Sequence, residues 1–330
     1  MSVPFLLYTI YRDMILDNLK FKILKKGGFV NSHAHLDRAY TYDYFSEVER
    51  TAFLTEKWKL VDRIRESNLE RDYKARLHLA LDRQKEKGVS HVMSFIDLDS
   101  TVGTKAINAA FNVKNERNDI QLLLACQTLK GVLDTKESSI IEENLHKVDI
   151  IGALPKADGD GRRGAHLDVV MSWAKKYDKR LHVHVDQLNL ESEKETELLA
   201  LKTMQHGLEG KVTAVHSISL ACHNKQYRQK VYQMSKDAGL SFISCPSAWI
   251  DSPRQELLTP THNSLTPVEE LLEHDLCVAI GSDNIHDVYK PYADGDMMFE
   301  LRLLLESFKL YDDDLLIKIA VDNGKQVIGA

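Results

Sequence analysis

The segment Gly28-Phe29-Val30-Asn31-Ser32-His33-Ala34-His35-Leu36-Asp37-Arg38 says more about the fold than any other stretch of the chain. It is a short apolar run that ends in His-x-His. Side chains two residues apart on a β-strand point to the same side, so His33 and His35 reach one point beyond the strand's end. Two neutral imidazoles supply half of a coordination sphere for zinc or ferrous iron. Because paired surface histidines are common, the motif becomes informative only when later segments repeat the pattern.

Seven further apolar or β-branched runs follow the first one. The eight runs span 28–33, 89–96, 120–126, 148–154, 180–185, 211–216, 240–245 and 275–281. Amphipathic stretches lie between most of them, such as the one in which Leu69, Tyr73, Leu77 and Leu81 recur every four residues. Similar helical patterns cover 103–115, 136–146, 165–177, 191–207, 226–238, 294–308 and 312–327. This alternation predicts an α/β fold, a (β/α)8 TIM-like barrel. The competing open doubly wound sheet would normally need fewer repeats.

Residues of the metal-binding type stand at the carboxyl ends of four predicted strands. They are His33 and His35 on the first strand, His184 on the fifth, His216 on the sixth and Asp283 on the eighth. In a barrel these ends meet at one face, where strand residues are otherwise mostly Val, Ile and Leu. Taken singly, each residue is explained as a hydrogen-bonded histidine or a helix-capping aspartate. Taken together, they predict a metal site.

With these segments the chain resembles the amidohydrolase superfamily, and within it the cytosine deaminase branch. The resemblance rests on residues 29–37, 184–187, 212–217 and 281–287, with weaker support from 151–155, and runs in order to the C-terminus. It implies a deformed barrel that holds one divalent metal ion, zinc or iron, through residues matching His33, His35, His184 and Asp283. It also implies that the residue matching His216 hydrogen-bonds the metal-bound water or the substrate. The reaction of this family is hydrolytic attack on a carbon that bears nitrogen.

The residue types fit such a reaction in their own right. A dipositive ion brings the pKa of a bound water towards neutrality. Asp283 is suited to take the proton from that water and return it to the leaving amine. His216 is suited to pair with the charge that develops on the substrate. We therefore expect Asp283 and His216 to be catalytic.

The fifth strand departs from the cytosine deaminase pattern in one residue. That branch carries His-x-Asp-Glu, and its glutamate passes a proton to the ring nitrogen, whereas this chain has Gln187. An amide side chain cannot act as a general acid or base, although it can orient a substrate by hydrogen bonds. This favours hydrolysis of an amide, a lactam or another C–N bond, with Asp283 as the sole proton shuttle. The alternatives are deamination of a heterocycle other than cytosine, and a catalytically silent metal-binding barrel, against which the intact ligand set argues.

Further residues after strand ends are candidates for substrate binding. Cytosine deaminases use a glutamine after the third strand, where this chain has Leu129, with Gln127 two residues earlier. Lys156 follows the fourth strand and precedes a glycine-rich loop that ends in Arg162-Arg163, a pair suited to an anionic substrate, although a solvated loop is the simpler interpretation. A carboxylated Lys156 that bridges two metals is a weaker alternative.

Two residues beyond the last strands complete the set of candidates. Trp249 follows the seventh strand and forms either an aromatic wall or a packing contact. Asn284, just past Asp283, is expected to position ligands or substrate. His182 shares a strand face with His184 but lies deeper, and we interpret it as a satisfied core histidine.

The ends of the chain predict its domain organisation. Relatives usually add a small β-sandwich built from a longer N-terminal segment and a C-terminal extension. Only about thirty residues precede His33 here, and the sequence stops at Ala330. We therefore expect the sandwich to be missing or vestigial, with residues 28–330 forming the barrel domain and residues 1–27 packing on it.

Composition sets the remaining limits. The net charge of -6 and the pI near 6.2 do not favour binding to nucleic acid. The four cysteines are scattered without a C-x-x-C pair, which favours a reducing, cytoplasmic location. The apolar segment 3–11 lacks a basic leader and a cleavage site, so no signal peptide or membrane span is expected. The expected partner is a small molecule, and a homo-oligomer is left open.

Overall fold

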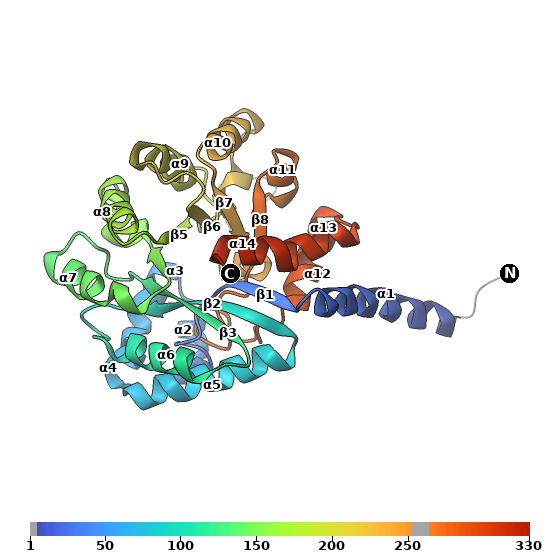
Figure 1. Ribbon diagram of the computed structural model, residues 1–330, viewed down its shortest axis with the longest axis horizontal. Helices are drawn as coiled ribbons and strands as arrows, with labels where there is room; N and C mark the ends of the chain where they lie inside the picture. The colour runs from blue at the N-terminus through green and yellow to red at the C-terminus, as the bar shows by residue number, and fades with distance from the viewer. Residues whose placement is uncertain (1–4, 252–263) are drawn as a thin grey trace.

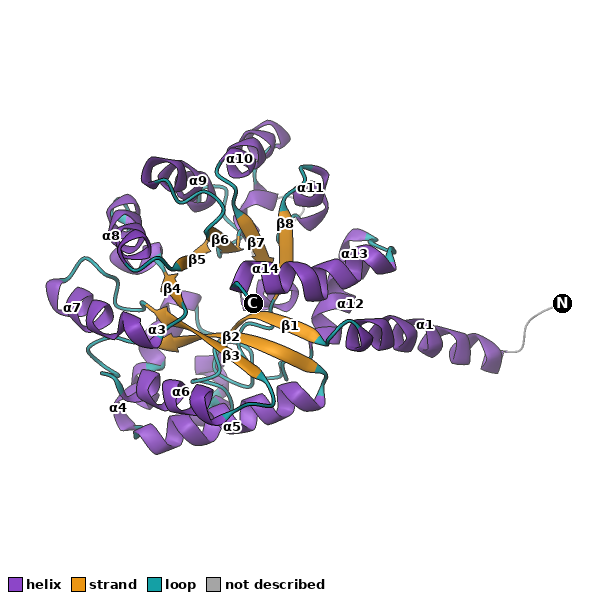
Figure 2. Cartoon of the chain, viewed as in Figure 1, coloured by secondary structure: helices purple, strands orange, loops and turns teal. Residues whose placement is uncertain are grey.

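A computed structural model describes residues 5–251 and 264–330, with side-chain surroundings for residues 15–248 and 264–330. One sheet of eight parallel strands runs in the order β1 to β8, and helices surround it (Figures 1 and 2). The strands are β1 (Phe29–Ala34), β2 (Val89–Asp97), β3 (Gln121–Gln127), β4 (Ile150–Ala153), β5 (Arg180–Val185), β6 (Val212–His216), β7 (Ser241–Ser244) and β8 (Cys277–Ile280). This is the predicted (β/α)8 barrel, and within the described ranges every named strand belongs to it.

The helices that alternate with the strands also follow the predicted pattern. They are α5 (Glu70–Glu86), α6 (Lys105–Glu116), α7 (Thr135–Asn144), α8 (Arg163–Lys176), α9 (Glu195–His206), α10 (Lys225–Asp237), α12 (Met297–Phe308), α13 (Asp313–Ile317) and α14 (Asn323–Ile328). The sequence pattern did not predict α1 (Phe5–Lys25), α2 (Glu47–Arg50), α3 (Leu54–Leu60), α4 (Asp62–Ser67) or α11 (Val268–Glu273). Three of these, α2 to α4, occupy the connection between β1 and β2.

Two apolar layers hold the barrel together. The outward-facing strand residues pack against the surrounding helices in the main core. Inside the barrel, inward-facing side chains such as Met93, Phe95 and Ile243 form a second cluster, which includes Val327 and Ile328 of α14. The last helix therefore closes the amino-terminal end of the barrel, and the carboxyl ends of the strands remain for a site.

The barrel closes between β1 and β8 through side chains and an isolated parallel bridge between Ala34 and Asp283. Asn31 Nδ2 donates to Ser282 Oγ at 2.8 Å, and Ser282 N donates back to Asn31 Oδ1 at 3.0 Å. The backbone N–H of Asp283 donates to the carbonyl of His33 at 2.9 Å. A Cβ added at Gly281 would lie 2.6 Å from the Cβ of His33, so only glycine permits this close approach. This seam brings the ends of β1 and β8 together.

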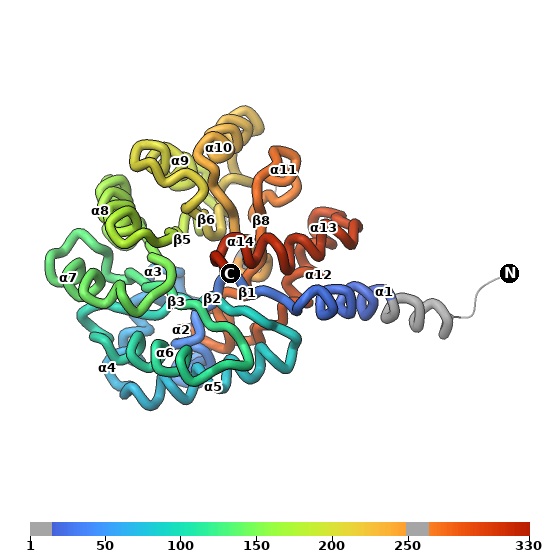
Figure 3. The backbone as a smooth tube through the Cα atoms, viewed as in Figure 1, coloured from blue at the N-terminus to red at the C-terminus, as the bar shows by residue number. Residues whose placement is uncertain are grey.

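The second half of helix α1 (Phe5–Lys25) lies beside α13 (Figures 1 and 3). In its second half, Leu19 and Ile23 are buried in the main core, and Lys22 Nζ lies 2.7 Å from a carboxylate oxygen of Asp313. Ile15 and Phe21, by contrast, are 67% and 64% exposed. The second half thus contacts the barrel, while the packing of residues 1–27 as a whole stays a prediction.

Two further observations bear on the expected location. None of the described helices combines the length and the apolar character needed to cross a membrane. All four cysteines carry free thiols.

Candidate active site

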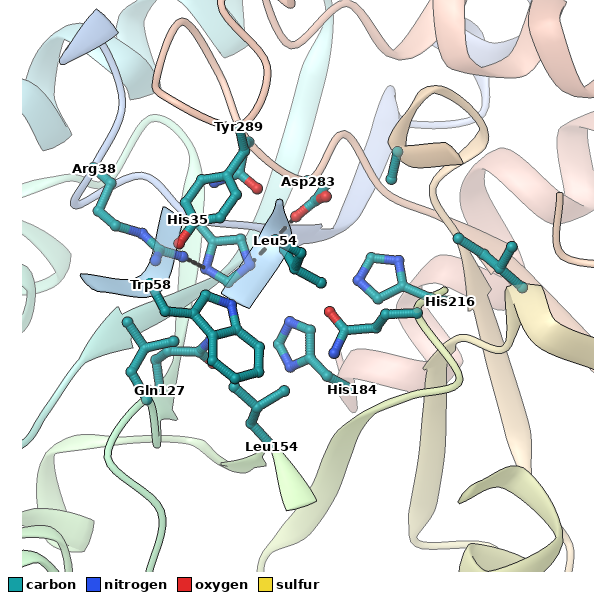
Figure 4. A pocket seen from close by; sticks show the side chains of 15 residues that line it. His35, Arg38, Leu54, Trp58, Gln127, Leu154, His184, His216, Asp283 and Tyr289 are labelled. Atoms are coloured by element: carbon teal, nitrogen blue, oxygen red, sulfur yellow. Dashed lines mark hydrogen bonds and ion pairs between the residues drawn. The ribbon is translucent and has the colours of Figure 1, made fainter. Parts of the chain in front are cut away.

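Five side chains predicted from strand ends meet at the mouth of the barrel, four of which are labelled in Figure 4. The nitrogens of His33, His35 and His184 that could bind a metal all lie within 4.8 Å of one another. The same holds for His33, His216 and the carboxylate of Asp283. Asp283 Oδ1 lies 3.3 Å from His35 Nε2 and 3.5 Å from His33 Nε2. The structure thus brings the predicted set to one point.

Burial fixes the protonation of these groups. Desolvation lowers the pKa of His33, His35 and His216 to about 4, and it holds the pKa of His184 well below the usual value. Burial also acts to raise the pKa of Asp283, but the neighbouring rings of His33 and His35 outweigh it and keep that pKa well below its usual value. At neutral pH the site therefore holds neutral imidazoles around an ionised carboxylate, the forms that bind metal ions.

Several buried nitrogens in this group have no hydrogen-bond partner. They are both ring nitrogens of His33, Nε2 of His184 and Nδ1 of His216. An unpaired buried polar group costs roughly 1–3 kcal/mol, a cost that a ligand bound to it would remove. Nδ1 of His184 lies 3.3 Å from the carbonyl oxygen of Ala153, so the other nitrogen of the ring is left for the centre of the group. The residues present therefore fit a divalent cation.

The backbone at these strand ends is held in an unusual conformation. Asp186, His216, Ser217 and Asp283 have φ values of 50°, 77°, 51° and 58°, in the left-handed region that side chains other than glycine rarely adopt. Each residue held in this conformation costs on the order of 1–3 kcal/mol of folding free energy, and such residues cluster at functional sites. Thr266 Oγ1 donates to the carbonyl of His216 at 2.6 Å and helps to hold that turn.

The group opens into a pocket that encloses about 520 Å³, part of it open to solvent. The polar part of its lining is made by His35, Arg38, Gln127, His184, Gln187, His216, Asp283, Asn284 and Tyr289. The apolar part is made by Leu54, Trp58, Leu129, Leu154, Ile218 and Ala248. The pocket therefore combines a polar floor that contains the candidate ligands with an extended apolar wall, as small-molecule sites commonly do.

Two known proteins are similar to this chain in sequence, and a solved structure is similar to it in fold. An uncharacterized protein of Haemophilus influenzae is 41% identical over 258 residues, which cover 77% of this chain and 94% of that protein. The N-isopropylammelide isopropyl amidohydrolase of a Pseudomonas species is 27% identical over 321 residues, 93% of this chain and 75% of that protein. The 5-methylcytosine deaminase of Klebsiella pneumoniae superimposes with a TM-score of 0.84 at 22% identity, covering 92% of this chain and 75% of that one.

The chain belongs to the amidohydrolase superfamily. No family profile matches it. An atrazine chlorohydrolase of Arthrobacter aurescens, solved with zinc, has the same fold, with a TM-score of 0.62 at 15% identity over 92% of this chain and 70% of that one. The sequence similarity to the Pseudomonas amidohydrolase, over 93% of this chain, bears out the expectations of this superfamily and of a hydrolytic enzyme.

In this structure the predicted substrate-binding residues lie in different surroundings. Gln127, Gln187 and Asn284 line the pocket, and Asn284 Nδ2 donates to Asp287 Oδ2 at 2.5 Å. Lys156 instead forms an ion pair with the buried Glu193 and is not among the lining residues. The side chain of Trp249 lies outside the described residues.

Arg38 lines the pocket, although the sequence pattern did not identify it as a site residue. Its Nη2 donates to His35 Nδ1 at 2.7 Å, and its guanidinium lies 5.2 Å from the centre of the Tyr289 ring. Arginine is always a donor, so in this arrangement His35 accepts at Nδ1 and carries its ring hydrogen on Nε2, which faces Asp283. Binding of a cation at Nε2 would require the other tautomer and the loss of the Arg38 hydrogen bond. The position of Arg38 three residues after His35, at the end of the same strand, is the signal that could have identified it.

Leu54 and Trp58 of α3 also line the pocket and were not predicted from the sequence. They lie in the connection between β1 and β2, outside the repeating strand–helix pattern. Only their spacing of four residues within one short helix links them in the sequence.

Proposed function

We propose that this amidohydrolase cleaves a C–N bond of a small molecule, an amide, a lactam or an amino-heterocycle, with a water activated by one divalent metal ion. His33, His35, His184 and Asp283 would hold the ion, zinc or iron. The observation that supports the proposal is the convergence of buried, neutral imidazoles around an ionised carboxylate at the floor of the pocket. Two of the similar proteins are named as an N-isopropylammelide amidohydrolase and a 5-methylcytosine deaminase.

The residues of the chain divide the work of hydrolysis between them. When bound, a divalent ion supplies the Lewis acidity that makes a water ligand acidic near neutral pH. Asp283, ionised and buried, would take the proton of the attacking water and deliver it to the leaving amine. His216, whose Nδ1 has no hydrogen-bond partner, would pair with the charge that develops on the substrate. Gln127, Gln187 and Asn284 would hold the substrate by hydrogen bonds.

A second candidate reaction is deamination of a heterocycle other than cytosine. Leu129 lines the pocket at the position where cytosine deaminases are expected to carry a pyrimidine-binding glutamine. Gln187 also lines the pocket and cannot transfer a proton. Both residues favour hydrolysis without a second proton shuttle, so we rank amide-type hydrolysis first. An anionic substrate stays a prediction, since Lys156, which suggested it, is paired with Glu193.

The test is a metal analysis of the purified protein, followed by an assay for released ammonia or amine. The panel should contain N-isopropylammelide, 5-methylcytosine, a simple lactam and a simple amide. Turnover that disappears with a chelator and returns with zinc or iron supports the proposal. A metal-loaded protein that releases neither amine nor ammonia from any of these compounds contradicts it. We also propose a cytoplasmic location, which the free thiols support.

A further inference from the structure

We propose that the connection between β1 and β2 forms a specificity cap, in which Leu54 and Trp58 of α3 bind an apolar group of the substrate. The cap comprises residues 42–67, from the short helix Tyr42–Tyr44 to the end of α4. The inference rests on the proposed function for the chemistry at the floor of the pocket. It adds the residues that select the substrate.

The cap has a small core of its own at the mouth of the barrel. This core joins residues of the cap to loops that follow β3, β4 and β8. Its buried members are Phe45, Val61, Ile64, Leu129, Leu154, Val288 and Tyr289, with Leu54, Trp58, Leu60 and Ala157 packed against them. The cluster is separate from both the main core and the inner cluster, so the cap is fixed to the rim of the site and not to the barrel's interior.

Polar contacts fix the orientation of α3 on this core. Glu56 caps the start of the helix by accepting the N–H of Phe53 at 3.0 Å. Lys57 is buried, and its Nζ lies 3.5 Å from the carbonyl oxygen of Tyr289. Beyond the helix, Lys130 Nζ lies 2.7 Å from Asp62 Oδ2, which ties the cap to the loop after β3. With the helix held at these points, Leu54 and Trp58, one turn apart, both face the pocket.

The burial of these two side chains indicates a role beyond packing. Val61 and Ile64 of the cap are almost wholly buried, at 2% and 1% exposure, whereas Leu54 and Trp58 remain partly exposed although they belong to the same cluster. Their exposed apolar surface faces a concave space that also contains His184 and Gln127, as Figure 4 shows. Apolar surface left open inside a pocket is where an apolar group of a ligand gains burial energy.

The apolar wall formed by Leu54, Trp58 and Leu154 indicates which substrates the enzyme prefers. A compound whose ring carries a small alkyl group would bury that group against Leu54, Trp58 and Leu154. The same ring without the alkyl group would leave the wall exposed. N-isopropylammelide and ammelide form such a pair, because they share the ring and differ in the isopropyl group. The wild-type enzyme should bind N-isopropylammelide more tightly.

The experiment compares Trp58→Ala, Trp58→Phe and Phe53→Ala with the wild type on both compounds. Phe53 is the matched control, an aromatic residue next to α3 that is 59% exposed and does not line the pocket. Trp58→Ala should raise the KM for N-isopropylammelide by about tenfold or more, the loss expected for a removed apolar contact of this size, and should change kcat little. Trp58→Phe should restore most of the binding, and Phe53→Ala should change nothing.

Binding can also be followed without turnover. Quenching of tryptophan fluorescence by N-isopropylammelide should be strong in the wild type and weak in Trp58→Phe. Equal KM changes for both compounds in Trp58→Ala, or wild-type preference for ammelide, would overturn the inference. Failure of either compound to bind would also overturn it. The hydrolase proposal would survive each of these results if other compounds of the panel were still cleaved in a reaction that His184→Ala abolishes.

Discussion

His182 and His184 stand two residues apart on β5 and point into the same barrel interior, yet they have different surroundings. Nε2 of His182 lies 2.9 Å from the carbonyl oxygen of Val327, at the closed end of the barrel. Each ring also has one buried nitrogen without a hydrogen-bond partner, Nδ1 in His182 and Nε2 in His184, but only that of His184 belongs to the group at the open mouth. Burial keeps both rings neutral, with a pKa of about 3 for His182. Depth along the strand therefore separates a structural histidine from a candidate ligand, although the residue type is the same.

The strongest test of this comparison is His184→Ala. We expect metal content to fall far below one ion per chain and turnover to fall to background, because three remaining ligands hold a metal much more weakly. The fold should persist, because the lost ring lies at the pocket floor, where it contacts Phe95 but is not itself a member of either apolar cluster. Elemental analysis and circular dichroism measure the two effects. Full metal occupancy in the folded variant would remove His184 from the ligand set.

Asp283→Asn separates metal binding from proton transfer at the same mouth. The amide can still offer one oxygen, so some metal should stay bound, but it cannot carry a proton. Turnover should be abolished while elemental analysis still finds metal. A variant that retained most of the wild-type kcat would show that the proton travels through another group.

His182→Leu tests the other half of the comparison. Removing this ring leaves the carbonyl of Val327 without its partner, at a cost of about 1–3 kcal/mol in the free energy of unfolding. Denaturant titration should show this loss, while metal content per folded chain stays at the wild-type value. Loss of the metal at unchanged stability would reverse the roles assigned to the two histidines.

Gln187 extends the comparison beyond the end of β5, where the strand turns into the pocket. If Gln187 only binds the substrate, Gln187→Ala should lower kcat/KM by roughly 5- to 150-fold, which corresponds to ~1–3 kcal/mol. Gln187→Glu should impair the native reaction and should create no aminopyrimidine deamination. Strong activation by Gln187→Glu would instead rank deamination above amide hydrolysis.

The sequence predicted the barrel because strand and helix periods are local. The run at 180–185 coincides with β5, and the ligand residues follow strand ends whose position depends only on neighbouring residues. The cap was missed since α2, α3 and α4 are four to seven residues long and do not repeat the strand–helix unit. Lys156 was interpreted as a substrate-binding residue because nothing near it in the sequence reveals its partner, Glu193, which lies 37 residues further along. Local periodicity thus located the floor of the pocket, whereas contacts between distant loops decide its wall.

The seam between β1 and β8 joins Asn31 to Ser282, which lie 251 residues apart in the chain. During synthesis, a ribosome-bound chain exposes His33 and His35 early but cannot bring Asp283 beside them until β8 has emerged and the barrel has closed. Contacts of such long range form late in folding. A complete coordination group is therefore a property of the finished chain alone, and uptake of a cation would mark the molecules whose first and last strands have met.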